Sequence, residues 1–196
     1  MYRNNTPYIS AHYSKQDYIN LNLSLNSDNE TFERAIEIFT DRIRSRFIDQ
    51  IHLLCNTNNG YDINGFSIMA LECLLVETFA QFKHGLNDTN GVSRDVYSRF
   101  LYNDLNCFPS LTVAKKFYSD IRCGILHQAQ TKPNSALTFN KADAIQWENN
   151  FLMVSVDRFA DKMDTYFSAY CNQLRDINQV DLRTNFIRKM DFICHR

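Results

Sequence analysis

Proline is nearly absent from this chain, and its distribution constrains the fold more than any other feature of the sequence. The three prolines stand at positions 7, 109 and 133, so the segments 8–108 and 134–196 contain none. A helix interior tolerates proline least, because the residue lacks a backbone N–H and its ring clashes with the preceding turn. The two proline-free stretches therefore favour helices, and we expect an all-α protein.

Apolar residues recur at helical spacing in several segments. From Phe32 to Leu54 they form one stripe, which predicts an amphipathic helix over residues 30–55. The segment GFSIMALECLLVETFAQF is apolar on nearly every side and predicts a central buried helix over 65–84. The same periodicity predicts helices over residues 92–105, 111–128, 149–175 and 181–194.

The order of these segments along the chain indicates an up-and-down bundle of four main helices. We expect an irregular N-terminal arm over residues 1–29 and a single helical domain over 30–196. Alternation in Ala136–Phe139 and Ala144–Trp147 predicts a small β-hairpin inserted before the long helix that starts at 149. The helix predicted over residues 181–194 then lies outside the four main helices of the bundle.

Charge and cysteine usage restrict the class of protein. The 21 Lys and Arg residues against 22 Asp and Glu residues give a net charge of −1, so any RNA or DNA binding must be local. The six cysteines form no CxxC pair, which indicates reduced thiols in the cytoplasm. The N-terminus has no apolar signal region, and Glu72, Glu77 and Gln81 interrupt the most apolar stretch. We therefore expect no export signal and no membrane span.

The sequence carries no recognisable metal or cofactor motif. It has no HExxH, no Cys/His pair at zinc spacing, no Asp-rich loop and no Gly-rich phosphate loop, so we expect neither a metal nor a cofactor. Glu72 and Glu77 are unusual because they lie in the most apolar helix, where carboxylates seldom lack partners. Either one faces the rim and the other forms an ordinary salt bridge, or one of them orients a neighbouring residue such as Arg122.

The segment from Ile121 to Ala129, IRCGILHQA, contains an arginine and a histidine at a recognisable spacing. Arg122 and His127 resemble the R-x(4–6)-H signature of the HEPN superfamily (higher eukaryotes and prokaryotes nucleotide-binding domains). The pairs Arg46…His52 and Arg188…His195 also fit this spacing. Context favours Arg122 and His127, which end a helix, follow the helix with Glu72 and Glu77, and precede the hairpin and the long helix.

Two further strings carry the resemblance. R-x-G-x-L-H-Q is similar to the form found in a HEPN branch of bacterial plasmids and defence loci, in which an earlier L-x-x-E-T-x-x-x-F-x-x-G helix resembles Leu74 to Gly85. The likeness spans residues 30–175. Ala129 stands where the R-x(4)-H-x-Y members have tyrosine.

The resemblance implies a metal-independent endoribonuclease that acts as a homodimer in a stress, toxin or phage-defence context. His127 would be the general acid/base, Arg122 would bind the phosphate, and Glu77, or alternatively Glu72, would orient Arg122. The implied partners are RNA, a second copy of the chain and an antitoxin or another defence-system protein. No membrane is implied.

Helix geometry adds an argument for the dimer. Five residues along an α-helix separate two side chains by about 7.5 Å and about 140°, so Arg122 and His127 do not share a stripe. A twofold dimer would bring two copies of each to one cleft. Glycine within a helix lowers its stability relative to alanine. We expect this loss to be tolerated at Gly124 because the missing side chain lets another backbone approach closely.

Other interpretations remain open. A non-catalytic HEPN-type module that binds RNA or protein would keep the motif for structure or for dimer contacts, and a nucleotide-binding or regulatory bundle is a third class. Without the family resemblance, Arg122 reads as a surface or ion-paired residue. His127 then reads as a cation favoured by the helix dipole.

Overall fold

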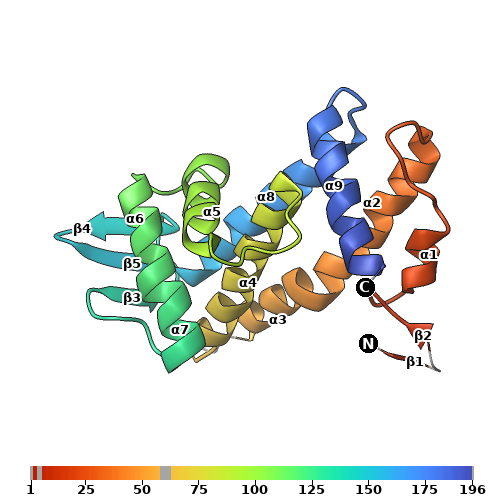
Figure 1. Ribbon diagram of the computed structural model, residues 1–196. Coiled ribbons are helices and arrows are strands. Elements are labelled where there is room, and N and C mark those ends of the chain that lie inside the picture. Colours follow the sequence, from red (N-terminus) through yellow and green to blue (C-terminus); the bar gives the residue numbers. More distant parts are fainter. Residues whose placement is uncertain (1, 4–5, 58–62, 196) are drawn as a thin grey trace. The chain divides into compact units, whose positions relative to one another are not determined.

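The computed structural model describes residues 2–3, 6–57 and 63–195 and is mostly helical (Figure 1). Its contacts divide the chain into two compact units. The first takes the described residues of Met1–Gln50, Gln81–Asp88 and Phe167–Arg196, and the second takes those of Ile51–Ala80 and Thr89–Tyr166. The broad expectation of a helical fold is confirmed.

The first unit is centred on a cluster of aromatic rings. Its helices are α1 (Lys15–Ile19), α2 (Asn29–Ile43), the end of α8 (Val156–Arg175) and α9 (Val180–Cys194), with the π-helical segment η1 (Arg44–Ile48) after α2. The ring of Phe39 lies 4.4 Å from that of Phe82 and 5.4 Å from that of Phe186, between ring centroids. Burial of these rings is the main apolar contribution to the stability of this unit.

The N-terminal arm is more ordered than we expected. Its described part contains the pair β1 (Tyr2–Arg3) and β2 (Thr6–Pro7), and α1 begins with a capping box formed by Ser14 and Asp17. Arg42 and Arg46 of the first unit donate hydrogen bonds to backbone carbonyls of the arm. These donors, far away in the sequence, give the arm its structure.

The second unit is built around α4 (Gly65–His84), most of which belongs to it. By length and composition alone α4 could cross a membrane, but 56% of its most apolar window is buried inside the protein. The core helix of a soluble protein passes the same test of length and composition. α3 (Asp49–Asn56), which follows η1, brings most of its residues to the same unit.

The two predicted helices over 92–105 and 111–128, together with residues 156–166 of α8, complete the helical part of this unit. The predicted helix over 92–105 consists of α5 (Ser93–Arg99) and the π-helical segment η2 (Phe100–Asp104). The predicted helix over 111–128 is a continuous rod of α6 (Leu111–Lys116), η3 (Phe117–Arg122) and α7 (Cys123–Gln128). Its N-terminus is capped by the Ser110 side chain, which accepts a hydrogen bond from the backbone N–H of Val113 at 3.3 Å. η3 is π-helical and ends at Arg122.

The predicted hairpin between Ala136–Phe139 and Ala144–Trp147 is wrong in its pairing. The sheet contains β3 (Ser135–Thr138), β4 (Ile145–Glu148) and β5 (Phe151–Ser155), in the order β3-β5-β4. β5 pairs in parallel with β3 and in antiparallel fashion with β4. Asn149 and Asn150, both at positive φ, connect β4 to β5, and this is the backbone conformation that a two-residue hairpin turn requires.

The presence of β5 also corrects the start of the long helix, which begins at Val156 rather than at 149. Leu152 and Val154 are fully buried on one face of β5, whereas Phe151 is exposed. The helix predicted over residues 149–175 included Leu152, because a single apolar residue is compatible with both the helical and the strand periodicity. The end of α8 at Arg175 agrees with the prediction.

Gly124 allows close approach of a backbone, but that backbone belongs to the same chain. α7 ends at Ala129 in the left-handed conformation, and Lys132 then donates from its backbone N–H to the carbonyl of Asp120 at 3.0 Å. A Cβ atom at Gly124 would lie 2.5 Å from the carbonyl oxygen of Gln130. The glycine therefore permits the chain to turn back along the helix that carries Arg122.

Candidate functional site

Arg122 and Glu77 form an ion pair inside the second unit. The Nη2 group of Arg122, at the end of η3, donates a hydrogen bond of 3.0 Å to Oε2 of Glu77 on α4. The side chains are 18% and 21% exposed, respectively, so the pair is largely screened from water. The contact expected between these two residues is present, and it fixes the guanidinium against α4.

Three hydroxyl-bearing residues extend this pair into what we call the Glu77 cluster, which comprises Glu77, Thr89, Ser93, Tyr118 and Arg122. Thr89 and Ser93 both donate to Oε1 of Glu77, the second bond at 3.2 Å. The hydroxyl of Tyr118 donates to Ser93 at 3.2 Å. The guanidinium carbon of Arg122 lies 5.3 Å from the centroid of the Tyr118 ring, within cation–π range.

Sequence reasoning did not identify Thr89, Ser93 or Tyr118 as members of the site. Tyr118 stands four residues before Arg122, which places the two on one helix face, and this spacing was a usable signal. Thr89 and Ser93 lie around a polar turn, and threonine and serine are common in loops, so the sequence does not distinguish these two residues as part of a site.

The cluster keeps both members of the ion pair charged. Burial alone raises the pKa of the Glu77 carboxyl, but the hydrogen bonds from Thr89 and Arg122 and the arginine charge bring it below its usual value. Burial alone lowers the pKa of Arg122, but the hydrogen bond and charge of Glu77 raise it above its usual value. Each partner thus favours the ionised form of the other.

His127 lies near the C-terminal end of α7 and is exposed to solvent. It forms no hydrogen bond or ion pair with Arg122, and the two residues do not converge within one copy of the described chain. A cation is favoured at this end of a helix, because the unsatisfied carbonyl groups carry partial negative charge. Within one chain the site therefore consists of an arginine held by Glu77 and a histidine exposed to solvent.

Glu72 does not orient Arg122. It is fully buried on α4, and neither carboxyl oxygen has a hydrogen-bond partner among the described residues. Burial, together with the charges of Asp157 and Asp161, raises its pKa well above the usual value. Glu72 is therefore a neutral acid in the core, and of these two residues it is Glu77 that contacts Arg122.

The other two Arg–His pairs lack an acid that holds the arginine. Arg46 donates to the backbone carbonyl of Tyr8, and burial lowers its pKa. Arg188 and His195 are both exposed. Of the three pairs with this spacing, Arg122 alone is hydrogen-bonded to a carboxylate within the part of the chain that the structure describes.

The described residues contain no group of three His, Cys, Asp or Glu side chains placed to hold a metal ion. Comparison with models of protein families, with curated proteins and with solved structures finds no match to this chain. The resemblance to the HEPN superfamily therefore depends on the residues quoted for it and stays a prediction.

The buried Glu72 gives a test of the environment of α4. Its raised pKa means that the folded chain keeps a proton which the unfolded chain loses above about pH 4.3. The contribution of Glu72 to stability therefore falls as pH rises through that window. We expect Glu72→Leu to raise the free energy of unfolding at pH 8, by about 1–3 kcal/mol, because it removes a buried polar group without a partner.

The measurement is urea unfolding of the wild type and the variant at pH 4 and pH 8. The gain in the free energy of unfolding from Glu72→Leu should be larger at pH 8 than at pH 4. The exposed Glu148 serves as a matched control, and Glu148→Leu should change stability equally at both pH values. A gain for Glu72→Leu that stays constant or shrinks with rising pH would contradict the assignment.

Proposed function

We propose that this chain is a metal-independent endoribonuclease of the HEPN type, which acts as a homodimer in the cytoplasm in a stress, toxin or phage-defence context. One observation supports the proposal above the others. Arg122 is held by the Glu77 carboxylate, and the helix that it precedes presents an exposed His127 within the R-x-G-x-L-H-Q string. Of the three Arg–His pairs, this is the one whose arginine is hydrogen-bonded to a carboxylate among the described residues.

The proposal includes an up-and-down bundle as the scaffold. Its four main helical segments would be α2 to α3, α4, α6 to α7, and α8. Their order along the chain is the order expected for such a bundle, with the sheet inserted before the fourth segment.

Arginine and histidine are sufficient for this chemistry because RNA supplies its own nucleophile. His127 would take the proton of a 2′-OH group or give a proton to the leaving oxygen. Arg122 would bind the phosphate as negative charge develops. Glu77 accepts from Nη2, so the guanidinium keeps other N–H donors for the phosphate.

A second copy of the chain would complete the site. Leu126 follows Arg122 by four residues and Leu74 precedes Glu77 by three, so each leucine lies on the helix face of one member of the ion pair. Both are exposed, at 48% and 44%. Large exposed apolar side chains beside a fixed polar pair suit an interface, and a twofold axis there would bring two Arg122 and two His127 residues together.

One observation favours the alternative, a non-catalytic HEPN-type module that binds RNA or protein. Arg122 contacts both Glu77 and the Tyr118 ring, and these contacts give it a structural role without any substrate. The test of ribonuclease activity therefore uses His127, because its side chain is exposed and can be removed with little effect on folding.

We expect His127→Ala to abolish cleavage of total cellular RNA by the pure protein in EDTA, with a rate loss of about 10²–10⁴-fold, because loss of a general acid/base removes proton transfer. Binding of an uncleavable 2′-O-methyl RNA should persist. His195→Ala is the matched control and should cleave normally. Arg122→Ala should weaken both binding and cleavage, and Arg122→Lys should restore them only in part, because an ammonium lacks the planar fork.

Circular dichroism and sizing must show that these variants stay folded. Equal RNA turnover by the wild type, His127→Ala and Arg122→Ala would contradict the enzyme assignment and leave Arg46…His52 and Arg188…His195 to be tested. Binding without any cleavage by the wild type would favour the binding module.

The dimer is tested separately with Leu126→Glu. A charge at an apolar interface is costly to bury, so this variant should shift the protein from dimer to monomer and lose cleavage together. Multi-angle light scattering at tens of micromolar measures the mass. Leu25→Glu, which changes an exposed leucine of the first unit, should remain a dimer. A wild-type monomer that cleaves RNA would contradict this part of the proposal.

A further inference from the structure

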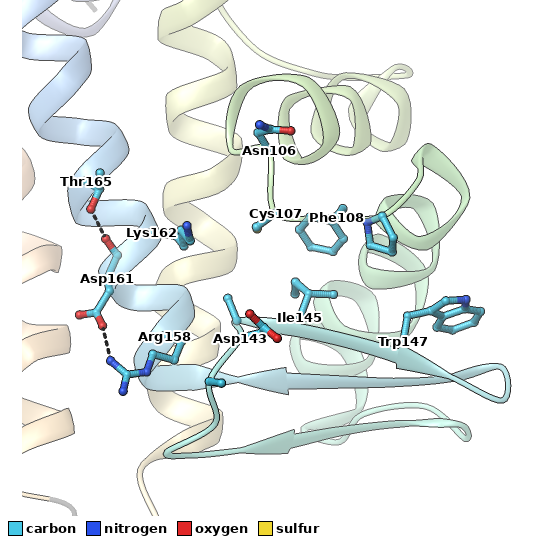
Figure 2. A pocket seen from close by; sticks show the side chains of 13 residues that line it. Asn106, Cys107, Phe108, Asp143, Ile145, Trp147, Arg158, Asp161, Lys162 and Thr165 are labelled. Carbon is cyan, nitrogen blue, oxygen red and sulfur yellow. Dashed lines mark hydrogen bonds and ion pairs between the residues drawn. The ribbon is translucent and has the colours of Figure 1, made fainter.

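A hollow of about 720 Å³ lies in the second unit (Figure 2). Three segments form it: the loop 106–109, the segment 142–147 with β4, and one face of α8 between Arg158 and Thr165. None of its lining residues belongs to the proposed ribonuclease site. The hollow therefore requires its own explanation.

One wall of the hollow is apolar and aromatic. Ile145 and Trp147 alternate along β4 and share the sheet face on which their partners, Val154 and Leu152, are buried. Trp147 is only half-buried, and it is the single tryptophan of the chain. The inner face of β4 thus leaves an indole ring accessible beside the hollow.

The charged side chains of the hollow divide into a paired set and an unpaired set. Arg158 donates to Asp161 at 3.3 Å and to the carbonyl of Lys141 at 3.0 Å, so these two charges offset each other. Lys162 and Asp143 form no hydrogen bond or ion pair within the described chain. Figure 2 shows Lys162 on α8 and Trp147 at the far end of β4, on opposite sides of the hollow.

The segment that enters the hollow at Ala142 is fixed by hydrogen bonds of the two residues before it. Asp157, at the start of α8, accepts hydrogen bonds from the backbone N–H of Asn140 at 3.1 and 3.2 Å. The hydroxyl of Ser155 donates to Asp157 at 2.7 Å and accepts from the backbone N–H of Lys141 at 3.2 Å. Order in the segment next to the lining reduces the entropy lost when a ligand binds.

An accessible indole, one unpaired ammonium group and one unpaired carboxylate select a ligand with three matching groups. The ligand needs a planar ring to stack on Trp147, an anion to meet Lys162 and an N–H donor to meet Asp143. A nucleotide has all three groups, in its base, its phosphate and the base edge. The volume of about 720 Å³ and the positions of Lys162 and Trp147 on opposite sides of the hollow (Figure 2) favour a strand of more than one nucleotide.

We propose that this hollow binds a short segment of single-stranded nucleic acid, with a base stacked on Trp147 and a phosphate bound by Lys162. Its occupancy does not depend on cleavage at Arg122 and His127. If those residues do form a ribonuclease site, the hollow would hold another part of the same strand.

The test uses Trp147 as its own reporter in the full-length protein. An eight-residue 2′-O-methyl oligonucleotide, which lacks the 2′-OH nucleophile, should quench tryptophan fluorescence with saturation. Lys162→Glu should weaken this binding about tenfold or more, whereas Lys141→Glu, the matched charge reversal at an exposed lysine outside the hollow, should change it less than twofold. Because this oligonucleotide cannot be cleaved, the result does not depend on catalysis at His127, which separates this proposal from the ribonuclease.

Trp147 itself is tested by fluorescence polarisation of a labelled oligonucleotide. Trp147→Ala should weaken binding about tenfold or more, and Trp147→Phe should retain most of it, because a base stacks on either ring. Circular dichroism checks that each variant is folded. Equal effects of Lys162→Glu and Lys141→Glu, or full binding by Trp147→Ala, would overturn the site. Guanosine 5′-monophosphate that binds as tightly as the oligonucleotide would overturn the assignment to a strand.

Discussion

The ion pair between Glu77 and Arg122 is the interaction on which the candidate site depends. α4 is the most apolar helix of the chain, and a carboxylate within it must be compensated by donors and by an opposite charge. Thr89, Ser93 and Arg122 supply them, so α4, the turn before α5, α5 itself and η3 all meet at one carboxylate. The position of the arginine is thereby set by the core and not by the surface. Glu72, on the same helix, has no such partners and stays neutral.

α7, which follows Arg122, carries the histidine of the candidate site. The π-helical turn ends at Arg122, and π-turns inside α-helices often occur at functional sites. Gly124 then lets the returning chain pass against α7, so one side of that helix is occupied while Leu126 and His127 face solvent. In the proposed dimer these exposed residues would supply the contact and the proton-transfer group. The hollow beside Trp147 and Lys162 would add affinity for the strand without taking part in the reaction.

Much of the helical pattern could be predicted from the sequence, because apolar periodicity and the distribution of proline act locally. The sheet could not, since β5 gains its identity from two partner strands, and Leu152 fits a helix as well as a strand. The Glu77–Arg122 contact was predictable because a carboxylate in an apolar helix needs a cation. Thr89 and Ser93 were not, because polar residues near turns look alike in sequence. The hollow was also beyond prediction, because it is formed by three segments that are distant along the chain.

The central claim, that Glu77 holds Arg122 in place, is tested most directly by a double-mutant cycle. Glu77→Gln, Arg122→Met and the double variant would be compared with the wild type by urea unfolding at pH 7, where the lowered pKa of Glu77 keeps it ionised. A hydrogen bond between charged groups predicts a coupling energy of about 1.5–3 kcal/mol. As pH falls through the pKa of Glu77 in the folded chain, this coupling should disappear. A coupling energy below about 0.5 kcal/mol at pH 7, as for an exposed surface pair, would contradict the account.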